Sequence, residues 1–323
     1  MSKLKLIRCS TIPLSLNIFC KGLLEHLSQD YEVVALSSPG KDLDEVRIRE
    51  GVRTIGVKME RKISLWRDLL SLLRLIAVFR RERPDVVHSM TPKAGLLCML
   101  ASMLTRVPVR IHTFTGLVFP TASGWKQKIL IATDRITCWC ATHVIPEGEG
   151  VKNDLLKYGI TSKPLQVLGY GNIRGIDLNY YRCDETIQGQ AQEIRQRYDN
   201  DFIFLYVGRI LDEKGMRELV TAYKRFDEAH AHSRLLLVGP IDTQGGLDSE
   251  TSSMILEHPH IEQIGFLPDV RAYYAASNCF VFPSYREGFG NVVMEAGAMG
   301  TPGLFGNTQA IIGDGLTILT SSM

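Results

Sequence analysis

Short runs of apolar and β-branched residues alternate with longer amphipathic stretches along almost the whole chain. Between the runs, the spacing of apolar residues predicts helices, including one from Ser64 to about Arg83, where Pro84 stops it, and one that opens at Thr91. Strands that alternate with helices are typical of parallel sheets with right-handed crossovers, so the sequence predicts an α/β protein. The expected strands are residues 4–10, 31–38, 52–59, 85–90, 109–114, 143–148, 202–208, 234–239, 261–266 and 279–284.

The alternation breaks once, at residues 165–181, where an expected strand is followed by glycines and irregular sequence. A chain of 323 residues is long enough for two domains. We therefore expect an N-terminal Rossmann-like domain over residues 1–168, an interdomain crossover over 169–200 and a second Rossmann-like domain over 201–323. Ligands of open parallel sheets bind beyond the carboxyl ends of the strands, so functional residues are sought there.

Several classes of protein are excluded by what the sequence lacks. No stretch approaches the roughly 20 apolar residues of a membrane-spanning helix, and the first residues lack the features of a secretory signal. The seven cysteines have no zinc-type spacing, and Cys138 and Cys140 are one residue apart rather than the two of a redox motif. No Asp-x-Asp follows a strand, and His258 and His260 are spaced for an exposed turn. We expect a cytoplasmic protein with reduced thiols, no cofactor and no metal.

Charge is distributed unevenly although the net charge is only +2. Residues 1–146 hold 22 Lys and Arg against 12 Asp and Glu, a net +10, and the remainder holds 15 against 23, a net −8. Either the basic half meets an anionic membrane surface, an anionic substrate or nucleic acid, or its charges scatter over solvated helix faces. The acidic second half, without a helix-turn-helix or an aromatic platform, disfavours nucleic acid. The densest basic region is Lys58, Arg61, Lys62, Trp66, Arg67, Arg74, Arg80, Arg81 and Arg83.

A first candidate motif is VGRILDEKG, residues 207–215. A predicted strand ends at Gly208, and Arg209 and Lys214 bracket the loop that leads into the next helix. Two cations close to a helix N-terminus suit a diphosphate. The alternative is a surface loop in which the two cations pair with Asp212 or Glu213.

A second candidate is FPSYREGFGNVVMEAGAMGTP, residues 282–302, which holds Glu287 and Glu295. Eight residues of helix advance about 800°, which leaves an offset of about 80°, so both carboxylates face one pocket only if Glu287 lies in the loop before the helix. Glycines in that loop let backbone N–H groups approach an anion. Taken alone, the pair could equally be a helix-capping carboxylate and a solvated one.

Together the two motifs resemble those of glycosyltransferase family 4, the retaining transferases with the GT-B fold. The family pattern Glu-x7-Glu is matched by Glu287 and Glu295, and the preceding Gly-Arg-x4-Lys-Gly by residues 208–215. The stretches TPKAGLL, VRIHTFTGLVF and GNIRGID extend the resemblance over nearly the whole chain, to bacterial members that build capsule, O-antigen or lipid-linked oligosaccharide. The resemblance implies two facing Rossmann-like domains with parallel sheets.

The resemblance also implies roles for residues of the second domain. Arg209 and Lys214 would bind the donor diphosphate and neutralise charge on the leaving nucleotide. Glu287 would contact the transferred sugar, and Glu295 would bind the ribose hydroxyls. Backbone amides of the loop would hold sugar and phosphate, and one further segment would contact the base. These are Phe289, Gly290 and Asn291 for the loop, and Gly265, Phe266 and Leu267 for the base.

In the first domain, His112 matches the histidine of the family's active site and is expected to contact a hydroxyl of the donor sugar. Thr91 and Lys93, at a helix N-terminus, are expected to touch an acceptor phosphate. The implied reaction moves a sugar from a nucleotide diphosphate, UDP in the first instance, to a polysaccharide or an undecaprenyl-diphosphate-linked saccharide. The enzyme would be cytoplasmic and peripheral at the inner face of the plasma membrane.

Two departures from the family pattern leave alternatives open. The first loop, CSTIPLSLNIFCKG, lacks paired glycines, and only 21 residues follow Pro302, enough for strands near 303–305 and 316–320 but not for closing helices. We expect the second sheet to be incompletely covered and the chain weakly stable or weakly active. The alternatives are a GT-B UDP-sugar epimerase, which needs no acceptor, and a shortened remnant that binds nucleotide without catalysis.

Overall fold

The computed structural model describes residues 3–60, 64–230, 232–241, 246–285 and 287–306. The chain divides into two compact units, Met1–Arg174 and Gly175–Met323. The division falls inside the stretch 169–200 that the sequence predicts as the crossover. The expected strand near 316–320 lies outside the described residues, whereas the one at 303–305 is present as β11 (Gly303–Phe305).

The first unit is built on a parallel sheet of six strands in the order β3-β2-β1-β4-β5-β6. The chain leaves β1 toward one edge and returns to the other side at β4, so the order reverses between these two strands. A reversal of this kind is where open α/β sheets bind ligands. The strands are β1 (Lys5–Cys9), β2 (Glu32–Ser37), β3 (Arg53–Gly56), β4 (Val86–Met90), β5 (Val109–Phe114) and β6 (His143–Pro146).

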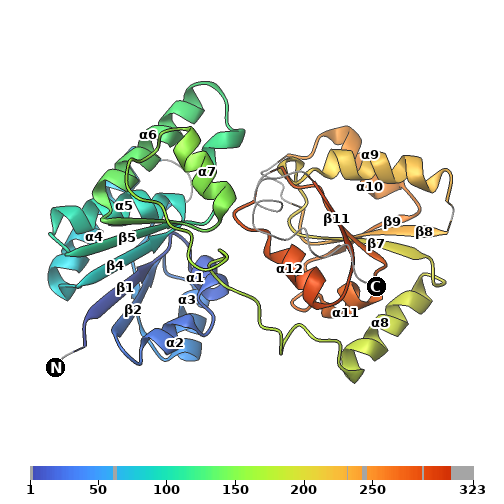
Figure 1. Cartoon of the computed structure of the whole chain (residues 1–323), viewed down its shortest axis with the longest axis horizontal. Helices are drawn as coiled ribbons and strands as arrows, with labels where there is room; N and C mark the ends of the chain where they lie inside the picture. The colour runs from blue at the N-terminus through green and yellow to red at the C-terminus, as the bar shows by residue number, and fades with distance from the viewer. Residues whose placement is uncertain (1–2, 61–63, 231, 242–245, 286, 307–323) are drawn as a thin grey trace. The chain divides into compact units, whose positions relative to one another are not determined.

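Helices cover both faces of this sheet (Figure 1). On one face, α1 (Pro13–Phe19), α2 (Leu23–Leu27) and α3 (Lys41–Glu50) enclose one apolar cluster. On the other, α4 (Leu65–Glu82), α5 (Pro92–Leu104), α6 (Gly124–Cys140) and α7 (Glu149–Lys157) enclose a second. The predicted start of α4 after Ser64 is confirmed, and its C-cap Arg83 adopts φ 47° before Pro84.

The second unit repeats the plan with a five-stranded parallel sheet in the order β11-β10-β7-β8-β9. The reversal here lies between β7 (Phe202–Val207) and β10 (Cys279–Phe282); β8 (Ser233–Val238) and β9 (Ile261–Gly265) complete the sheet. Figure 1 draws α9 (Met216–Asp227) and α10 (Ser249–Glu257) on one side, and α11 (Arg271–Ala276) and α12 (Asn291–Ala298) on the other. The ten strands expected in the two alternating regions, residues 4–148 and 202–284, are therefore all present, and most of their ends differ from the expected ends by no more than two residues.

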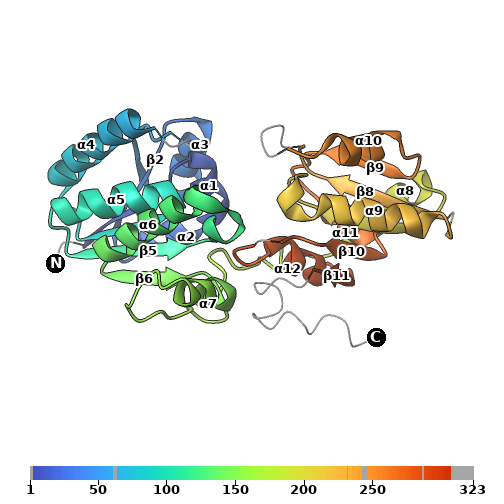
Figure 2. The ribbon, with the colours of Figure 1, turned by 90° about the horizontal axis from the view of Figure 1, so that it is seen from above.

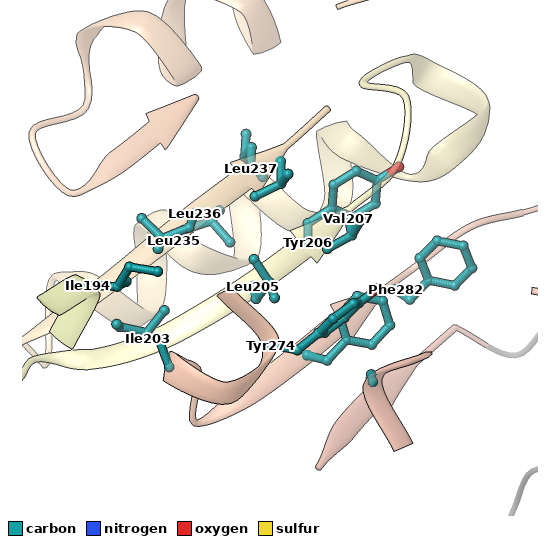
Figure 3. Close-up of a cluster of buried hydrophobic side chains, with 14 of the residues drawn as sticks. Ile194, Ile203, Leu205, Tyr206, Val207, Leu235, Leu236, Leu237, Tyr274 and Phe282 are labelled. Carbon is teal, nitrogen blue, oxygen red and sulfur yellow. The ribbon is translucent and has the colours of Figure 1, made fainter. Parts of the chain in front are cut away.

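The core of the second unit is one apolar cluster centred on β7 and β8. Leu205, Tyr206 and Leu236 are fully buried there, and Tyr274 packs beside them (Figure 3). The helix α8 (Glu185–Arg197), which the sequence does not predict, adds Ile187 and Ile194 to this cluster. The expected strand at the start of 165–181 does not form, because these residues run as an irregular segment without sheet partners.

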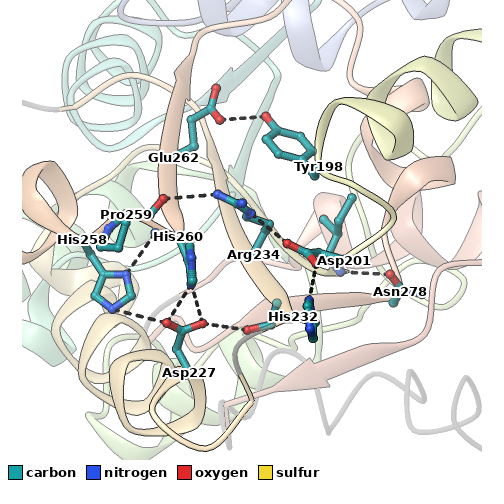
Figure 4. Close-up of polar contacts among 12 residues, drawn as sticks. Tyr198, Asp201, Asp227, His232, Arg234, His258, Pro259, His260, Glu262 and Asn278 are labelled. Atoms are coloured by element: carbon teal, nitrogen blue, oxygen red, sulfur yellow. Dashed lines mark hydrogen bonds and ion pairs between the residues drawn. The ribbon is translucent and has the colours of Figure 1, made fainter.

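His258 and His260 do not lie in an exposed turn, so that expectation was wrong. The Asp227 carboxylate accepts a hydrogen bond from His260 Nδ1 at 2.9 Å, and His258 Nε2 lies 3.9 Å from it (Figure 4). Nearby, Arg234 pairs with Asp201 at 3.1 Å. These contacts tie the end of α9 to the strands beneath it, a structural role.

Candidate donor and acceptor sites

The two sequence motifs of the second unit meet where its strand order reverses. The loop after β7 contains a 3₁₀ turn, η2 (Asp212–Lys214), and the loop after β10 contains Glu287. Lys214 Nζ lies 2.5 Å from Glu287 Oε1, and both side chains are largely buried. The backbone N–H of Tyr285 donates to the carbonyl of Glu213 at 3.2 Å, which joins the loops a second time. Lys214 therefore pairs with a carboxylate of the second loop, and not solely with Asp212 or Glu213 of its own loop.

Gly215 allows the two loops to approach this closely. It is the N-cap of α9 with φ 72°, and a Cβ on it would lie 2.3 Å from the carbonyl oxygen of Pro283. Any other residue would meet both a left-handed backbone and a backbone clash. In this motif Lys214 supplies the cation, and Gly215, which has no side chain, lets the first loop approach the second loop closely enough for the contact.

Arg209 lies exposed at the start of the same loop, and its carbonyl accepts a hydrogen bond from the buried Tyr206 hydroxyl at 2.9 Å. Burial raises the pKa of Tyr206, the negative charge of Glu287 raises it further, and Arg209 opposes the rise. Tyr206 therefore stays neutral between these two charges. Arg209, Lys214 and Glu287 are brought to one end of the sheet, two cations and one carboxylate.

The loop after β10 leads directly into α12. Glu287 lies before the helix, which meets the condition for the two carboxylates to serve one pocket. Phe289 is buried, Gly290 caps the helix with φ 82°, and Asn291 is its first residue. The N–H groups at such a helix start are well placed to bind an anion.

Glu295 lies one turn inside α12 and is 7% exposed. The Tyr274 hydroxyl lies 3.4 Å from its Oε2 and 3.2 Å from the carbonyl of Val292. One hydroxyl, that of Tyr274, therefore contacts both the Glu295 carboxylate and the backbone of the first turn of α12. A buried carboxylate with a hydroxyl donor is oriented rather than solvated, as a ligand for a diol needs.

The segment expected to contact the base begins at Gly265, the last residue of β9, and β8 separates β9 from β7. Gly265 has φ 84° and its carbonyl accepts from the N–H of Gly239 at 2.8 Å. Phe266 is 74% exposed, and Leu267 packs on the core. The Phe266 ring therefore lies outside the core and exposes an apolar surface to solvent.

In the first unit, His112 is 1% exposed near the end of β5. Its Nδ1 lies 2.8 Å from the Ser89 hydroxyl, Phe114 packs edge-on against the ring at 4.5 Å, and a Cβ on Gly95 would lie 2.4 Å from it. Burial lowers the pKa of His112 to about 3. The imidazole is therefore neutral at physiological pH, so a contact with a ligand would be a hydrogen bond rather than an ion pair.

A buried polar chain on β1, β4 and β5 was missed by reasoning from the sequence. Arg8, 3% exposed, donates through Nη1 to His88 Nδ1 at 2.5 Å, and His88 Nε2 lies 2.8 Å from the Thr113 hydroxyl. Because arginine only donates, His88 must accept at Nδ1 and carry its proton on Nε2. Burial and then the charge of Arg8 lower the pKa of His88. The available signal was a charged residue inside an otherwise apolar strand, in register with His88.

Thr91 and Lys93 lie at the start of α5, where the strand order of the first unit reverses. Thr91 has φ 71°, and its hydroxyl accepts from the N–H of Thr11 at 3.1 Å. The side chain of Thr11, rather than that of Thr91, caps α5 by accepting from Ala94 N–H at 3.0 Å. Lys93 Nζ pairs with Asp68 of α4 at 2.8 Å, so an acceptor phosphate would have to share it.

Across the described ranges, no group of three or more His, Cys, Asp or Glu is arranged to hold a metal ion. Within the same part of the chain, no helix has both the length and the apolar character needed to cross a bilayer.

Two units, each built on a parallel sheet of the Rossmann-like kind, are the architecture of the GT-B fold. HepE of Anabaena, solved with UDP and glucose, aligns with a TM-score of 0.76 over 96% of this chain and 82% of its own, at 16% identity. Family models match as well: "Glycosyl transferase 4-like domain" over residues 18–171 and "Glycosyl transferases group 1" over residues 188–312.

Curated relatives agree with these family models. The capsular polysaccharide biosynthesis glycosyltransferase CapM of Staphylococcus aureus is 32% identical over 97% of this chain and 81% of its own. An Escherichia coli UDP-Gal:α-D-GlcNAc-diphosphoundecaprenol α-1,3-galactosyltransferase is 26% identical over 76% of this chain and 64% of its own. The chain belongs to glycosyltransferase family 4.

Proposed function

We propose that this glycosyltransferase moves a hexosyl or N-acetylhexosaminyl group from a UDP-sugar to a saccharide acceptor, with retention of the anomeric configuration. The observation that carries the proposal is the pairing of Lys214 with Glu287 at the reversal of strand order in the second unit, with Arg209 at the start of the same loop as Lys214. Two cations there suit a diphosphate, and the carboxylate suits the hydroxyls of the attached sugar.

Each residue has a role in this proposal. Arg209 and Lys214 bind the diphosphate and stabilise charge on the departing nucleotide. Glu287, now paired with Lys214 at 2.5 Å, exchanges part of that contact for sugar hydroxyls when donor binds. Glu295, held by Tyr274, binds the ribose, and the amides of residues 289–291 hold sugar and phosphate. The base lies against residues 265–267.

The first unit supplies the acceptor side and one donor contact. His112 contacts a hydroxyl of the transferred sugar as a neutral group, because burial keeps its pKa at about 3. Thr91 and Lys93 contact the acceptor phosphate. Support for a lipid-linked acceptor comes from the Escherichia coli relative, which acts on a diphosphoundecaprenol saccharide, and support for UDP from the HepE complex. The enzyme would then be cytoplasmic and work at the inner face of the membrane that holds its acceptor.

Calorimetric titration with UDP and with GDP tests the donor site. We expect UDP to bind, Arg209→Ala and Glu295→Ala each to weaken binding at least about tenfold, and GDP to bind more weakly. Arg225→Ala, which removes an exposed arginine of α9, is the matched control and should leave binding unchanged. A folded wild type that binds neither nucleotide contradicts the proposal.

The alternatives are separated by incubation with UDP-sugars followed by NMR. Interconversion of UDP-N-acetylglucosamine without an acceptor would indicate the epimerase. A protein that binds the nucleotide but transfers no sugar to any acceptor tested would indicate the inactive remnant. Transfer that gives a product with the donor's anomeric configuration supports a retaining transferase, and the opposite configuration rules it out.

A further inference from the structure

Three helices of the first unit form one layer over its sheet. Helix α4 packs against α5, and α5 against α6. Their inner side chains, among them Leu75, Leu97 and Cys138, share one apolar cluster with the strands. Figure 2 shows the same three helices from a second direction. The surface that these helices turn away from the sheet is called here the outer face of the layer.

The outer side of α4 is apolar in its first three turns. Trp66 is 77% exposed, Leu70 50% and Leu73 53%, whereas Leu75 and Phe79 on the opposite side are buried. Trp66 and Leu73 are seven residues apart, about two helical turns, so they lie on one stripe. An amphipathic helix that uses its apolar residues only to cover a sheet would not expose this stripe.

Helices α5 and α6 continue the apolar surface. On α6, Trp125, Ile136 and Trp139 are 77%, 43% and 70% exposed, and their separations of eleven and fourteen residues are close to whole numbers of turns. Leu104 of α5 is 52% exposed. Leu96, Leu100 and Met103 of α5 are half-buried. An apolar surface that runs over three adjacent helices is larger than the isolated exposed side chains of ordinary protein surfaces.

The acidic and the basic side chains of α4 and α6 lie on different sides of these helices. All three acidic side chains of α4 and α6 are turned inward: Asp68 pairs with Lys93, Glu82 pairs with Arg53, and Asp134 is 8% exposed. The exposed charged side chains of the two helices are all basic: Arg67, Arg74, Arg80, Arg81, Lys126, Lys128 and Arg135. The outer face therefore combines exposed apolar residues with positive charge only.

Arg67, Arg74 and Arg81 repeat every seven residues and so follow one side of the apolar stripe of α4. Arg67 and Arg74 line a small hollow together with Lys58, Glu60, Leu70 and Ser71. Glu60 pairs with Arg67 at 3.0 Å and lies 3.6 Å from Lys58 Nζ. With Arg74, the lining of this hollow holds three cations and one carboxylate. A phosphate group matches that excess of positive charge.

We propose that the outer face of α4, α5 and α6 docks on a bilayer that contains anionic phospholipid. The tryptophans and leucines enter the interfacial region, and the arginines and lysines contact lipid phosphates, the hollow beside α4 holding one headgroup. Charge complementarity favours this occupant over a second copy of the chain, because two such faces would repel each other. The proposal goes beyond sugar transfer and does not depend on it.

The tryptophans make the test specific. The chain has three, Trp66, Trp125 and Trp139, and all are exposed on this layer. We expect their fluorescence to shift to the blue when vesicles of phosphatidylglycerol and phosphatidylcholine are added to the full chain. Brominated lipids should quench it, and vesicles of phosphatidylcholine alone should give a much smaller change.

Variants separate the apolar and the charged contributions in vesicle co-sedimentation. Trp66→Ser with Leu73→Ser should weaken binding about tenfold or more. Arg67→Gln with Arg74→Gln should weaken binding to anionic vesicles and reduce its dependence on salt. Leu256→Ser, at an apolar side chain of α10 that is 74% exposed, is the control and should bind as the wild type does. None of these substitutions touches the residues assigned to the donor, so UDP binding should be unchanged.

Two outcomes would overturn the proposal. One is a folded wild type whose fluorescence is the same with and without anionic vesicles. The other is self-association in sedimentation velocity that Trp66→Ser abolishes while vesicle binding persists, which would make the face an interface between copies. Neither experiment uses a sugar donor, so loss of the docking proposal and loss of the proposed transferase reaction would be seen separately.

Discussion

Lys214 and Glu287 are 73 residues apart in the chain, and their side chains meet at 2.5 Å. The pair joins the loop after β7 to the loop before α12 and lies at the reversal of strand order. Each side chain is about 15% exposed, so water solvates the two charges only in part. Each charge is therefore stabilised mainly by its partner. The contact holds the two loops together, and in the proposed function it also positions a cation for the donor diphosphate.

A double-mutant cycle measures the structural part of this relationship. We expect Lys214→Met and Glu287→Gln each to lower the free energy of unfolding, with a coupling of about 1–3 kcal/mol. The pair is mostly buried, and loss of one partner leaves the other charge uncompensated. Urea unfolding of the four proteins gives the coupling, and strict additivity would show that the pair does not act as a unit.

The same variants separate the proposed roles in donor binding. Lys214→Met should weaken UDP binding about tenfold or more, since it removes a cation that contacts the diphosphate. Glu287→Gln should bind UDP at least as tightly as the wild type. UDP lacks the transferred sugar that Glu287 is proposed to contact, and loss of the carboxylate charge frees Lys214 to bind the diphosphate. Calorimetry checks both, and equal losses in the two variants would contradict the assignment of Glu287 to the sugar.

Gly215→Ala should be far more costly than a matched change at Gly300. The two glycines have φ 72° and 75°, but a Cβ at Gly300 meets nothing within 4 Å, whereas one at Gly215 meets the carbonyl of Pro283 at 2.3 Å. We expect Gly300→Ala to cost about 1 kcal/mol and Gly215→Ala about 3 kcal/mol, with weaker UDP binding only in the latter. Similar costs in urea unfolding would show that the loops are not tightly apposed.

His112 should show no titration in NMR spectra recorded between about pH 5 and 8. Burial lowers its pKa to about 3 in the folded protein, below the value of about 6.5 expected for an unfolded chain. The unfolded state therefore takes up the proton first, and His112 removes stability as pH falls below about 6.5. His112→Gln assigns the resonance, and a midpoint near neutrality would exclude the buried, neutral imidazole.

Asp134 gives the opposite dependence on pH. Burial raises its pKa to about 7, above the value of about 3.9 for an unfolded chain. Its stabilising contribution is fully present below about pH 3.9 and is lost as pH rises through about 7, by on the order of 4 kcal/mol. Asp134→Asn should remove this loss, so that its stability relative to the wild type increases from pH 4 to 8. Asp30→Asn, at an exposed position, should not change the dependence.

The alternation of apolar runs was sufficient to predict the strands and most of the helices. Parallel strands covered on both faces must be continuous apolar runs, which are visible without the structure. Helix α8 was missed because its sequence is largely polar and only Ile187, Ala191 and Ile194 reach the core. The strand expected near residue 165 shows the opposite error: the segment has apolar residues, but it pairs with no strand of either sheet.

The fold class, the family and the two motifs that carry the candidate donor residues could be predicted from the sequence, because each is visible in residues close together in the chain. The tertiary structure was needed to show which distant residues meet. Lys214 pairs with Glu287 rather than Asp212, Lys93 with Asp68, and Arg8 with His88. It also decided that α4 exposes Trp66 and Leu73 while its acidic residues turn inward. The physical reason is that a periodic pattern fixes which residues share a helix face. Whether that face is buried or exposed, and which charged side chains pair with its residues, depends on elements far away in the sequence.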